Sequence, residues 1–250
     1  MPDTDFVIKT RNLVKIYKQG NIKAVDGLNL SIRKSEIYAF IGANGSGKTT
    51  TIKMLTGILD PTSGSINVFG LSVPKNRKII SRYIGIAPQD YSIYNDLTVK
   101  ENIKFFANLY GMSKNKFEAK IGQLIQILQL EDKKNALVAN LSGGLKRRVS
   151  IACALIHSPR LVFFDEATVG IDPILRKFFW EYFNKLKEEG LTLVISSHVM
   201  DEAERADRIG LIRAGKLIDE GKPEELKEKH NVDTIEEVFI KLSDERIRDG

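Results

Sequence analysis

The spacing of apolar residues changes along this chain, and the first part has the spacing of β-strands. Runs rich in β-branched and aromatic residues occur at 6–17 (FVIKTRNLVKIY), 24–32 (AVDGLNLSI) and 36–42 (EIYAFIG), with Gly, Asn and Asp between them. Such runs predict strands joined by tight turns. A turn signal, DPTSG, and a further short strand, SINVFG, are expected at 60–64 and 65–70.

The middle of the chain has helical spacing instead. Between Thr98 and Leu130, apolar residues recur every three or four positions in VKENIKFFANLY and KFEAKIGQLIQILQL. We therefore expect helices here. They would form a helical subdomain at about residues 90–145, inserted into the sheet.

Strands and helices alternate in the rest of the chain. The expected order is strand 161–166, helix 173–190, strand 191–198, helix 200–207, hairpin 208–221 and a charged helical tail at about 223–250. This alternation implies a parallel sheet that is covered on both faces. The predicted fold class is α/β, with a parallel core sheet, an antiparallel β subdomain near the N-terminus and the inserted helical subdomain.

Length and charge narrow this interpretation only a little. The chain has 250 residues, which predicts a single domain over 1–250, with its core at about 6–222. Its 38 Lys and Arg residues and 32 Asp and Glu residues are spread along the chain, so the net charge of +6 indicates a solvated, mildly basic surface. An anionic partner, such as nucleic acid or a membrane surface, is the less favoured interpretation of that charge.

The single cysteine, Cys153, lies in the apolar run VSIACALI and is expected in the core. With one cysteine no disulfide can form within the chain, which fits a reducing compartment. The first residues, MPDTDFVIKT, are acidic and contain no apolar run, so we expect no signal peptide. No stretch approaches the roughly 18 apolar residues of a membrane span, so none is expected.

The octapeptide GANGSGKT at 42–49 matches the phosphate-binding pattern G-x-x-x-x-G-K-[ST]. It follows the apolar strand IYAFI and precedes a helical stretch, which is the context that the pattern requires. Backbone N–H groups of such a loop point inward, and the start of the helix adds partial positive charge, so the loop can hold nucleotide phosphates. Lys48 is expected to reach the β- and γ-phosphates, and the Thr49 hydroxyl to bind Mg²⁺. The candidate ATP-binding residues here are Gly42, Ala43, Asn44, Gly45, Ser46, Gly47, Lys48, Thr49 and Thr50.

Two acids follow a second apolar strand, in LVFFDE at 161–166. At the carboxyl end of a central strand, Asp165 would face Lys48 and Thr49 and could help to hold Mg²⁺. Glu166 could orient a water that attacks the γ-phosphate, or accept its proton. Taken alone, an acid pair after a strand is often only a helix N-cap.

The order of these motifs resembles that of the ATP-binding subunits of ABC transporters. The resemblance rests on GANGSGKT, the glutamine in IAPQD, LSGGLKRRV, LVFFDEATVGIDP and ISSH, and it covers about residues 6–222. Within that family the chain is most similar to the ATPases of ABC-2-type exporters, which serve drug, lipid and polysaccharide efflux. The segments LSGGLKRRV, SSHVMDEAERADRIGLIRAGKLIDEG and TIEEVFIKL suggest this subgroup. The resemblance implies the P-loop NTPase fold of the ABC ATPases.

The resemblance also implies roles for residues outside the phosphate loop. Tyr17 would stack on adenine, Gln89 would contact Mg²⁺ and the attacking water, and His198 would bond the γ-phosphate. Asp172 would belong to a loop that touches a partner subunit, although it could also cap the helix that starts at Pro173. The expected catalytic residues are then Lys48, Gln89, Glu166 and His198, and the expected magnesium ligands are Thr49, Gln89 and Asp165. The alternatives for Tyr17, Gln89 and His198 are an ordinary surface, loop or structural residue, and His157 and His230 receive no role.

LSGG is a second glycine loop at a predicted helix start, and it has no lysine in the place of Lys48. A helix N-terminus can still bind a terminal phosphate. We expect a two-fold pair in which Ser142, Gly143 and Gly144 of each chain complete the ATP site of the other. The following KRR at 146–148 is interpreted as a solvated helix face. Three residues depart from the common family pattern, namely Leu145 in place of Gln, and Ala167 and Val169 in ATVG.

The expected function is an ATP-hydrolysing subunit, a homodimer or a pair with a similar subunit, that binds two Mg–ATP and energises a transporter. The permease would be a separate protein, and the chain would lie on the cytoplasmic side of the membrane. Aromatic residues after Gln89, including Tyr91 and Tyr94, would receive the permease helices. No nucleic-acid partner is expected. The alternatives are an ABC-type ATPase that acts on ribosomes or DNA, and a regulator that binds ATP without hydrolysing it.

Overall fold

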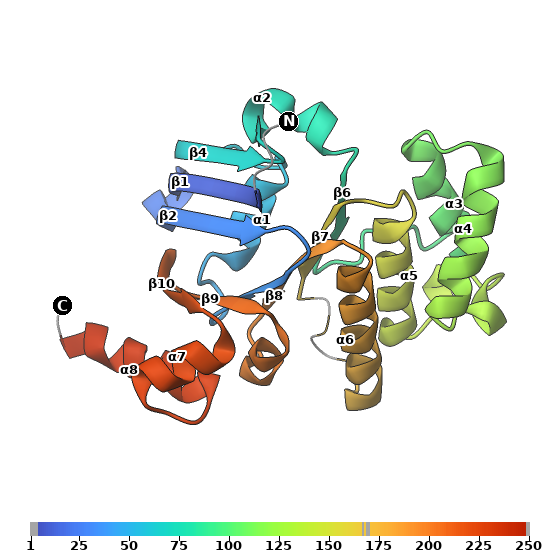
Figure 1. Cartoon of the computed structure of the whole chain (residues 1–250). Coiled ribbons are helices and arrows are strands. Elements are labelled where there is room, and N and C mark those ends of the chain that lie inside the picture. The colour runs from blue at the N-terminus through green and yellow to red at the C-terminus, as the bar shows by residue number, and fades with distance from the viewer. Residues whose placement is uncertain (1–4, 167, 169–170, 249–250) are drawn as a thin grey trace.

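Two β-sheets of different kinds make up the body of the protein (Figure 1). The computed structural model describes residues 5–166, 168 and 171–248, with side chains through Ser243. The first sheet is antiparallel and has the order β2-β1-β4-β5. Its strands are β1 (Phe6–Tyr17), β2 (Ile22–Arg33), β4 (Ser63–Val68) and β5 (Leu71–Ser72), and the 3-10 turn η1 (Gln19–Asn21) joins β1 to β2.

The second sheet is the parallel core, with the order β10-β9-β3-β8-β7-β6. Only the edge strand β10 runs antiparallel to its neighbour. The strands are β3 (Ile37–Ile41), β6 (Ile84–Ala87), β7 (Leu161–Asp165), β8 (Thr192–Ser197), β9 (Arg208–Arg213) and β10 (Lys216–Gly221).

Both faces of the parallel sheet are covered, which explains its apolar sequences. Every residue of β3, β7 and β8 is buried. In β3, Tyr38 and Phe40 point to one side and join a core cluster with Ile8 and Leu13 of the antiparallel sheet. The alternate residues of β3 point to the other side, into the cluster formed with the helices. Because side chains on a strand alternate between faces, a strand buried on both faces is an almost continuous apolar run.

The helices are α1 (Lys48–Leu55), α2 (Val73–Ile80), α3 (Val99–Leu109), α4 (Lys114–Ile127), α5 (Gly143–Leu155), α6 (Pro173–Glu188), α7 (Pro223–His230) and α8 (Ile235–Arg248). Three further 3-10 helices are η2 (Glu131–Lys133), η3 (Val138–Asn140) and η4 (Met200–Arg205). Within the described part of the chain, none of the helices has the length and apolar character needed to span a bilayer.

Helices α3 and α4 form a lobe beside α5, on the side of the molecule away from the antiparallel sheet (Figure 1). Helix α3 begins with a capping box, in which the Glu101 amide donates to Thr98 Oγ1 at 3.2 Å and the Thr98 amide donates to Glu101 Oε2 at 2.9 Å. Buried residues such as Ile103 and Leu124 pack the lobe into the same core cluster as α5. The lobe therefore packs against α5 through a shared apolar core.

The helix predicted at 200–207 is a 3-10 helix, η4, at residues Met200–Arg205. Its Glu202 side chain is buried and accepts hydrogen bonds from two hydroxyl groups in the core. The predicted hairpin at 208–221 is confirmed as β9 and β10, and within the described residues the segment after Gly221 contains α7 and α8.

Candidate nucleotide-binding and catalytic site

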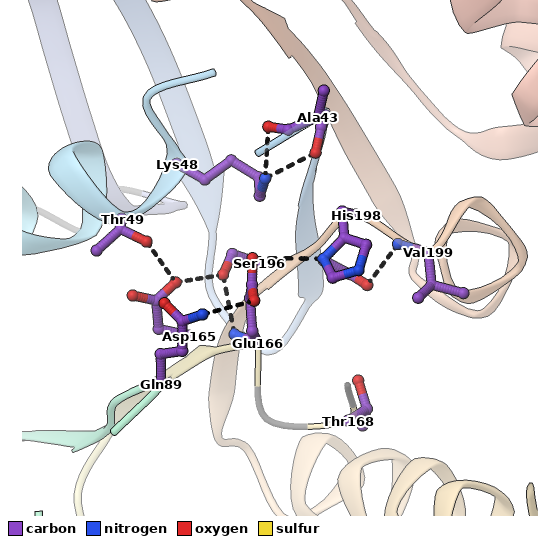
Figure 2. Close-up of polar contacts among 12 residues, drawn as sticks. Ala43, Lys48, Thr49, Gln89, Asp165, Glu166, Thr168, Ser196, His198 and Val199 are labelled. Atoms are coloured by element: carbon purple, nitrogen blue, oxygen red, sulfur yellow. Dashed lines mark hydrogen bonds and ion pairs between the residues drawn. The ribbon is translucent and has the colours of Figure 1, made fainter. Parts of the chain in front are cut away.

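Four adjacent parallel strands end at one edge of the core sheet, and each leads into a candidate site residue. Strand β3 leads into the loop 42–47, β8 into His198, β7 into Glu166 and β6 into Gln89. Asp165 is the last residue of β7. Because the carboxyl ends of neighbouring parallel strands lie together, residues far apart in sequence meet here (Figure 2).

The loop after β3 borders a cavity of about 250 Å³. Gly47 has a φ of 108°, and a Cβ added to it would lie 2.3 Å from the Ala24 carbonyl oxygen. Only glycine fits where the chain turns this close to β2. The cavity is lined by Ala24, Asn44, Gly45, Ser46, Gly47, Lys48, Thr49, Thr50, Gln89 and Glu166.

Two buried polar groups of this loop suit a phosphate. Lys48 Nζ donates to the carbonyl oxygens of Gly42 at 2.7 Å and Ala43 at 3.0 Å. Burial lowers the pKa of Lys48, and the carboxylates of Glu166 and Asp165 oppose that shift. Ser46 Oγ is buried and has no hydrogen-bond partner among the described residues. An anion in the cavity could accept hydrogen bonds from both groups, so the residues fit the phosphates of a nucleotide.

Asp165, at the end of β7, is hydrogen-bonded to Thr49 of the phosphate loop. Its Oδ1 accepts hydrogen bonds from Thr49 Oγ1 at 3.1 Å and from Ser196 Oγ at 2.5 Å. Ser196 lies directly beside Asp165 in the register of β7 and β8. The Thr49 hydroxyl and the Asp165 carboxylate therefore lie within hydrogen-bond distance of each other. Oxygen ligands of this kind are those that Mg²⁺ prefers.

Glu166 is the meeting point of three loops (Figure 2). Its backbone has a φ of 52°, an uncommon conformation for a residue other than glycine, and its amide donates to the Ser196 carbonyl at 3.1 Å. Gln89 Nε2 donates to Glu166 Oε2 at 3.0 Å, and His198 Nδ1 lies 3.5 Å from Glu166 Oε1. Because its carboxylate also borders the cavity, Glu166 is placed to act on a molecule bound there.

Some predicted site residues lie outside the cavity lining. Tyr17 is 37% exposed at the end of β1, and its hydroxyl is 3.4 Å from Thr50 Oγ1, which places its ring beside the phosphate loop. Asp172 accepts a hydrogen bond from the Leu175 amide at 2.9 Å and caps α6, as one of the two interpretations expected. Its contact with a partner stays a prediction. Ala167 and Val169 lie outside the described residues.

The second glycine loop also lies apart from this cavity. Ser142 is the N-cap of α5 and accepts from the Leu145 amide at 3.5 Å. Ser142 and Gly143 are exposed, Gly144 is partly so, and none of the three lines the cavity. The first turn of α5 thus presents backbone N–H groups at the surface, where a helix lacks internal acceptors for them.

The interpretation of 146–148 as a solvated helix face is wrong. Arg147 is buried, and its guanidinium donates to the Pro88 and Gln89 carbonyl oxygens. Arg148 Nη1 donates to the Leu128 carbonyl and to Gln129 Oε1, both at 3.2 Å. The spacing of Arg147 to the buried Ile151, one helical turn later, was the available sign that this side of α5 faces inward.

The parallel sheet, the phosphate loop between β3 and α1, and the acids at the end of β7 define a P-loop nucleotide-binding domain. The chain belongs to the ABC transporter family, whose pattern matches residues 25–169. The fold class expected from the sequence, that of the ABC ATPases, is confirmed by structural neighbours.

Known relatives and structures agree with this assignment. Over 241 residues the chain is 38% identical to the "Probable multidrug ABC transporter ATP-binding protein YbhF" of Escherichia coli (strain K12), covering 94% of this chain and 41% of that protein. It is 40% identical over 231 residues to the "Nod factor export ATP-binding protein I" of Burkholderia orbicola (strain AU 1054), covering 92% of this chain and 75% of that protein.

A solved structure matches with a TM-score of 0.80 and 27% identity, covering 86% of this chain and 98% of that one. That structure is a dimeric post-hydrolysis state of the ATP-binding cassette MJ0796 bound to ADP and Pi. The chain spans less than half the length of the first curated relatives that it matches.

Proposed function

We propose that this chain binds and hydrolyses ATP as a dimer and energises an exporter of the ABC-2 type. The observation that carries the proposal is the convergence of the loop 42–49, Gln89, Glu166 and His198 at the ends of four adjacent strands. Phosphoryl transfer to water requires a phosphate cradle and a positioned acceptor for the water's proton, which the loop 42–49 and Glu166 would supply.

Each residue of the candidate site can have a separate role that follows from its position. Lys48 can exchange its loop carbonyls for phosphate oxygens, and Ser46 can donate its free hydroxyl. Thr49, Gln89 and Asp165 would hold Mg²⁺, which when bound supplies positive charge against the phosphate oxygens. Glu166 would orient the attacking water and accept its proton, while His198 would donate to the γ-phosphate. Tyr17, beside Thr50, would stack on the adenine ring.

The dimer is proposed because the chain carries a second glycine loop at a helix start, away from its own cavity. The exposed first turn of α5, at Ser142, Gly143 and Gly144, would bind the γ-phosphate held by the other chain. The related cassette described as a dimer with ADP and Pi supports such a pairing. In a two-fold pair each chain would then complete the site of its partner, and Asp172 would lie near the shared surface.

A separate permease is the proposed partner, and it would hold the chain at the cytoplasmic side of the membrane. The candidate contact is an exposed aromatic surface on the helical lobe. Tyr94 is 49% exposed and packs edge-on against Phe105 of α3, with ring centroids 4.7 Å apart. Leu109, one helical turn beyond Phe105, is also exposed. Tyr91, which was expected to share this role, is half-buried and packs against Arg147, and its contact with the permease stays a prediction.

The catalytic test is Glu166→Gln, which keeps the size of the side chain and removes its capacity to accept a proton at neutral pH. We expect ATP binding to persist, hydrolysis to fall by at least about a hundredfold, and an ATP-bound dimer to accumulate on size-exclusion chromatography. Glu189→Gln, an exposed acid beyond the end of α6, is the matched control and should hydrolyse ATP normally. Hydrolysis by Glu166→Gln at the wild-type rate would contradict the assignment.

The permease contact is tested by Tyr94→Glu in membranes that contain the complete transporter. A charge in the aromatic surface should abolish transport and leave the ATPase activity of the isolated chain within about twofold, because Tyr94 does not line the ATP cavity. Ile58→Glu, at an exposed position after α1, serves as the control. Normal transport by Tyr94→Glu would exclude this surface as the docking site.

A further inference from the structure

Arg147 connects the second glycine loop to the loop that carries Gln89. The residue lies in the second turn of α5 and is only 5% exposed. Its Nη1 donates to the Pro88 carbonyl oxygen at 2.7 Å, and its Nη2 donates to the Gln89 carbonyl oxygen at 3.1 Å. Two nitrogens of one planar group thus hold two successive carbonyl groups, which fixes the orientation of the peptide unit between them.

Tyr91 makes a second, independent contact between the same two segments. The Arg147 guanidinium carbon lies 4.9 Å from the centroid of the Tyr91 ring. On the same side chain, the Tyr91 hydroxyl oxygen would lie 3.1 Å from a Cβ added to Gly143. The segment from Pro88 to Tyr91 is therefore packed along the first two turns of α5, from Gly143 to Arg147.

We propose that Arg147 is a positioning residue that links the two ATP sites of the dimer. The inference rests on the proposed function, in which the Gly143 end of α5 contacts the partner's nucleotide. On the other side of Arg147, Gln89 bonds Glu166 through its side chain at 3.0 Å. A shift of α5 on contact with the partner's phosphate is passed through Arg147 to the Gln89 main chain, and so to the acid that acts on this chain's own ATP.

The chemistry of the contact favours arginine over other residues. A lysine at 147 has a single ammonium nitrogen, which can hold one of the two carbonyls well but cannot reproduce the planar fork. A methionine fills a similar volume and lies against the Tyr91 ring, but it has no hydrogen to donate. Arg147→Lys should therefore weaken the contact with the two carbonyls, and Arg147→Met should remove its hydrogen bonds. Both lysine and methionine favour a helix, so α5 should form in either variant.

Arg148 provides a matched control on the same helix. It also donates to main-chain carbonyls, but those of Leu128 and Gln129 at the end of α4, away from the Gln89 loop. Replacing Arg148 by Met removes a comparable anchor of α5 to the helical lobe. It leaves both hydrogen bonds from Arg147 in place.

The experiment measures ATP affinity, kcat and the Hill coefficient of ATPase activity for the wild type, Arg147→Met, Arg147→Lys and Arg148→Met. Arg147→Met should lower kcat by about tenfold to a hundredfold, because a catalytic group displaced by about 1 Å loses that much rate. Its Hill coefficient should fall from near 2 toward 1, and its ATP affinity should stay within about twofold. The kcat and Hill coefficient of Arg147→Lys should lie between those of Arg147→Met and the wild type. Those of Arg148→Met should equal the wild-type values.

A second measurement separates linkage from simple support of the helix. In the Glu166→Gln background, Arg147→Met should still form the ATP-bound dimer, since Ser142 and Gly143 are intact. Loss of that dimer, or an equal loss of kcat in Arg148→Met, would mean that Arg147 only stabilises α5 and would overturn the inference. Unchanged kcat and Hill coefficient in Arg147→Met would overturn it as well. A wild type that neither dimerises with ATP nor shows cooperativity would instead overturn the proposed function, and this inference with it.

Discussion

Glu202 is a buried carboxylate that joins the loop after β7 to the loop after β8, and its removal should cost much of the protein's stability. The residue is 1% exposed. Its Oε2 accepts hydrogen bonds from Thr168 Oγ1 and Ser197 Oγ, both at 2.7 Å, and Arg176 Nε lies 3.5 Å from Oε1. Thr168 follows Glu166 by two residues and Ser197 precedes His198, so Glu202 braces both sides of the candidate site.

The size of the effect follows from what each variant leaves without a partner. Glu202→Leu keeps a similar volume but strands two buried hydroxyls and a partly buried guanidinium, which should destabilise the protein by about 3–5 kcal/mol. Thr168→Val alone removes one hydrogen bond to a charged acceptor and should cost about 1.5–3 kcal/mol. In the Glu202→Leu background the same valine removes a hydroxyl that has already lost its partner. There it should cost almost nothing.

The assay is a double-mutant cycle of urea unfolding at pH 7, with the free energy of unfolding taken from linear extrapolation. We expect a coupling energy between Thr168 and Glu202 of about 2 kcal/mol. If Thr168→Val costs the same in both backgrounds, within about 0.5 kcal/mol, the two side chains do not stabilise each other and the reasoning fails. Asp219→Asn, which alters a carboxylate at the other end of the core sheet, should show no coupling to Thr168→Val.

Two further predictions concern the phosphate loop and the pH dependence of stability. Gly47→Ala should abolish ATP binding in an equilibrium titration, because its Cβ would lie 2.3 Å from the Ala24 carbonyl oxygen. In Gly45→Ala no atom would lie within 4 Å of the new Cβ, so this control should cost only about 1–2 kcal/mol of backbone strain. Burial lowers the pKa of His157 to about 4. As the pH falls, this histidine therefore binds a proton in the unfolded chain before it does so in the folded protein. The free energy of unfolding should fall by about 2 kcal/mol between pH 6.5 and pH 5 for this reason. His157→Gln should remove that part of the decline in urea unfolding, and an unchanged pH profile would contradict the lowered pKa.

The elements that the sequence predicted well are those whose burial is uniform. Strands β3, β7 and β8 are buried on both faces, so each could be predicted from its apolar run alone. The short elements α2 and β6 were not predicted. Helix α2 buries only Val73 and Ile80, and β6 has four residues, so neither offers enough positions for a period to be recognised.

The side chains that support the site were harder to predict than those that face the cavity. The loop 42–49 has a recognisable spacing of glycine, lysine and threonine. Arg147 and Glu202 look like ordinary surface charges in sequence, yet both are buried. The helical spacing of Arg147 to Ile151 indicates an inward-facing side of α5, but it does not indicate the partners of Arg147. The partners of both residues are main-chain carbonyls and hydroxyls from distant segments, which leave no pattern in the residue types nearby. Only the three-dimensional arrangement shows what these charges hold.

The polar groups of the site bind one another, and this limits how strongly each can favour the nucleotide. Lys48 donates to two loop carbonyls, Thr49 donates to Asp165, and Gln89 donates to Glu166. Under the proposed function, Mg–ATP would exchange these internal hydrogen bonds for new ones, so each exchange would contribute about 1 kcal/mol rather than the full strength of the new bond. In the proposed function, Glu166 would exchange its hydrogen bond from Gln89 for one from the attacking water. Because Arg147 holds the main chain of Gln89 against α5, we expect this exchange to depend on the position of α5 and, in the proposed dimer, on the approach of the second subunit.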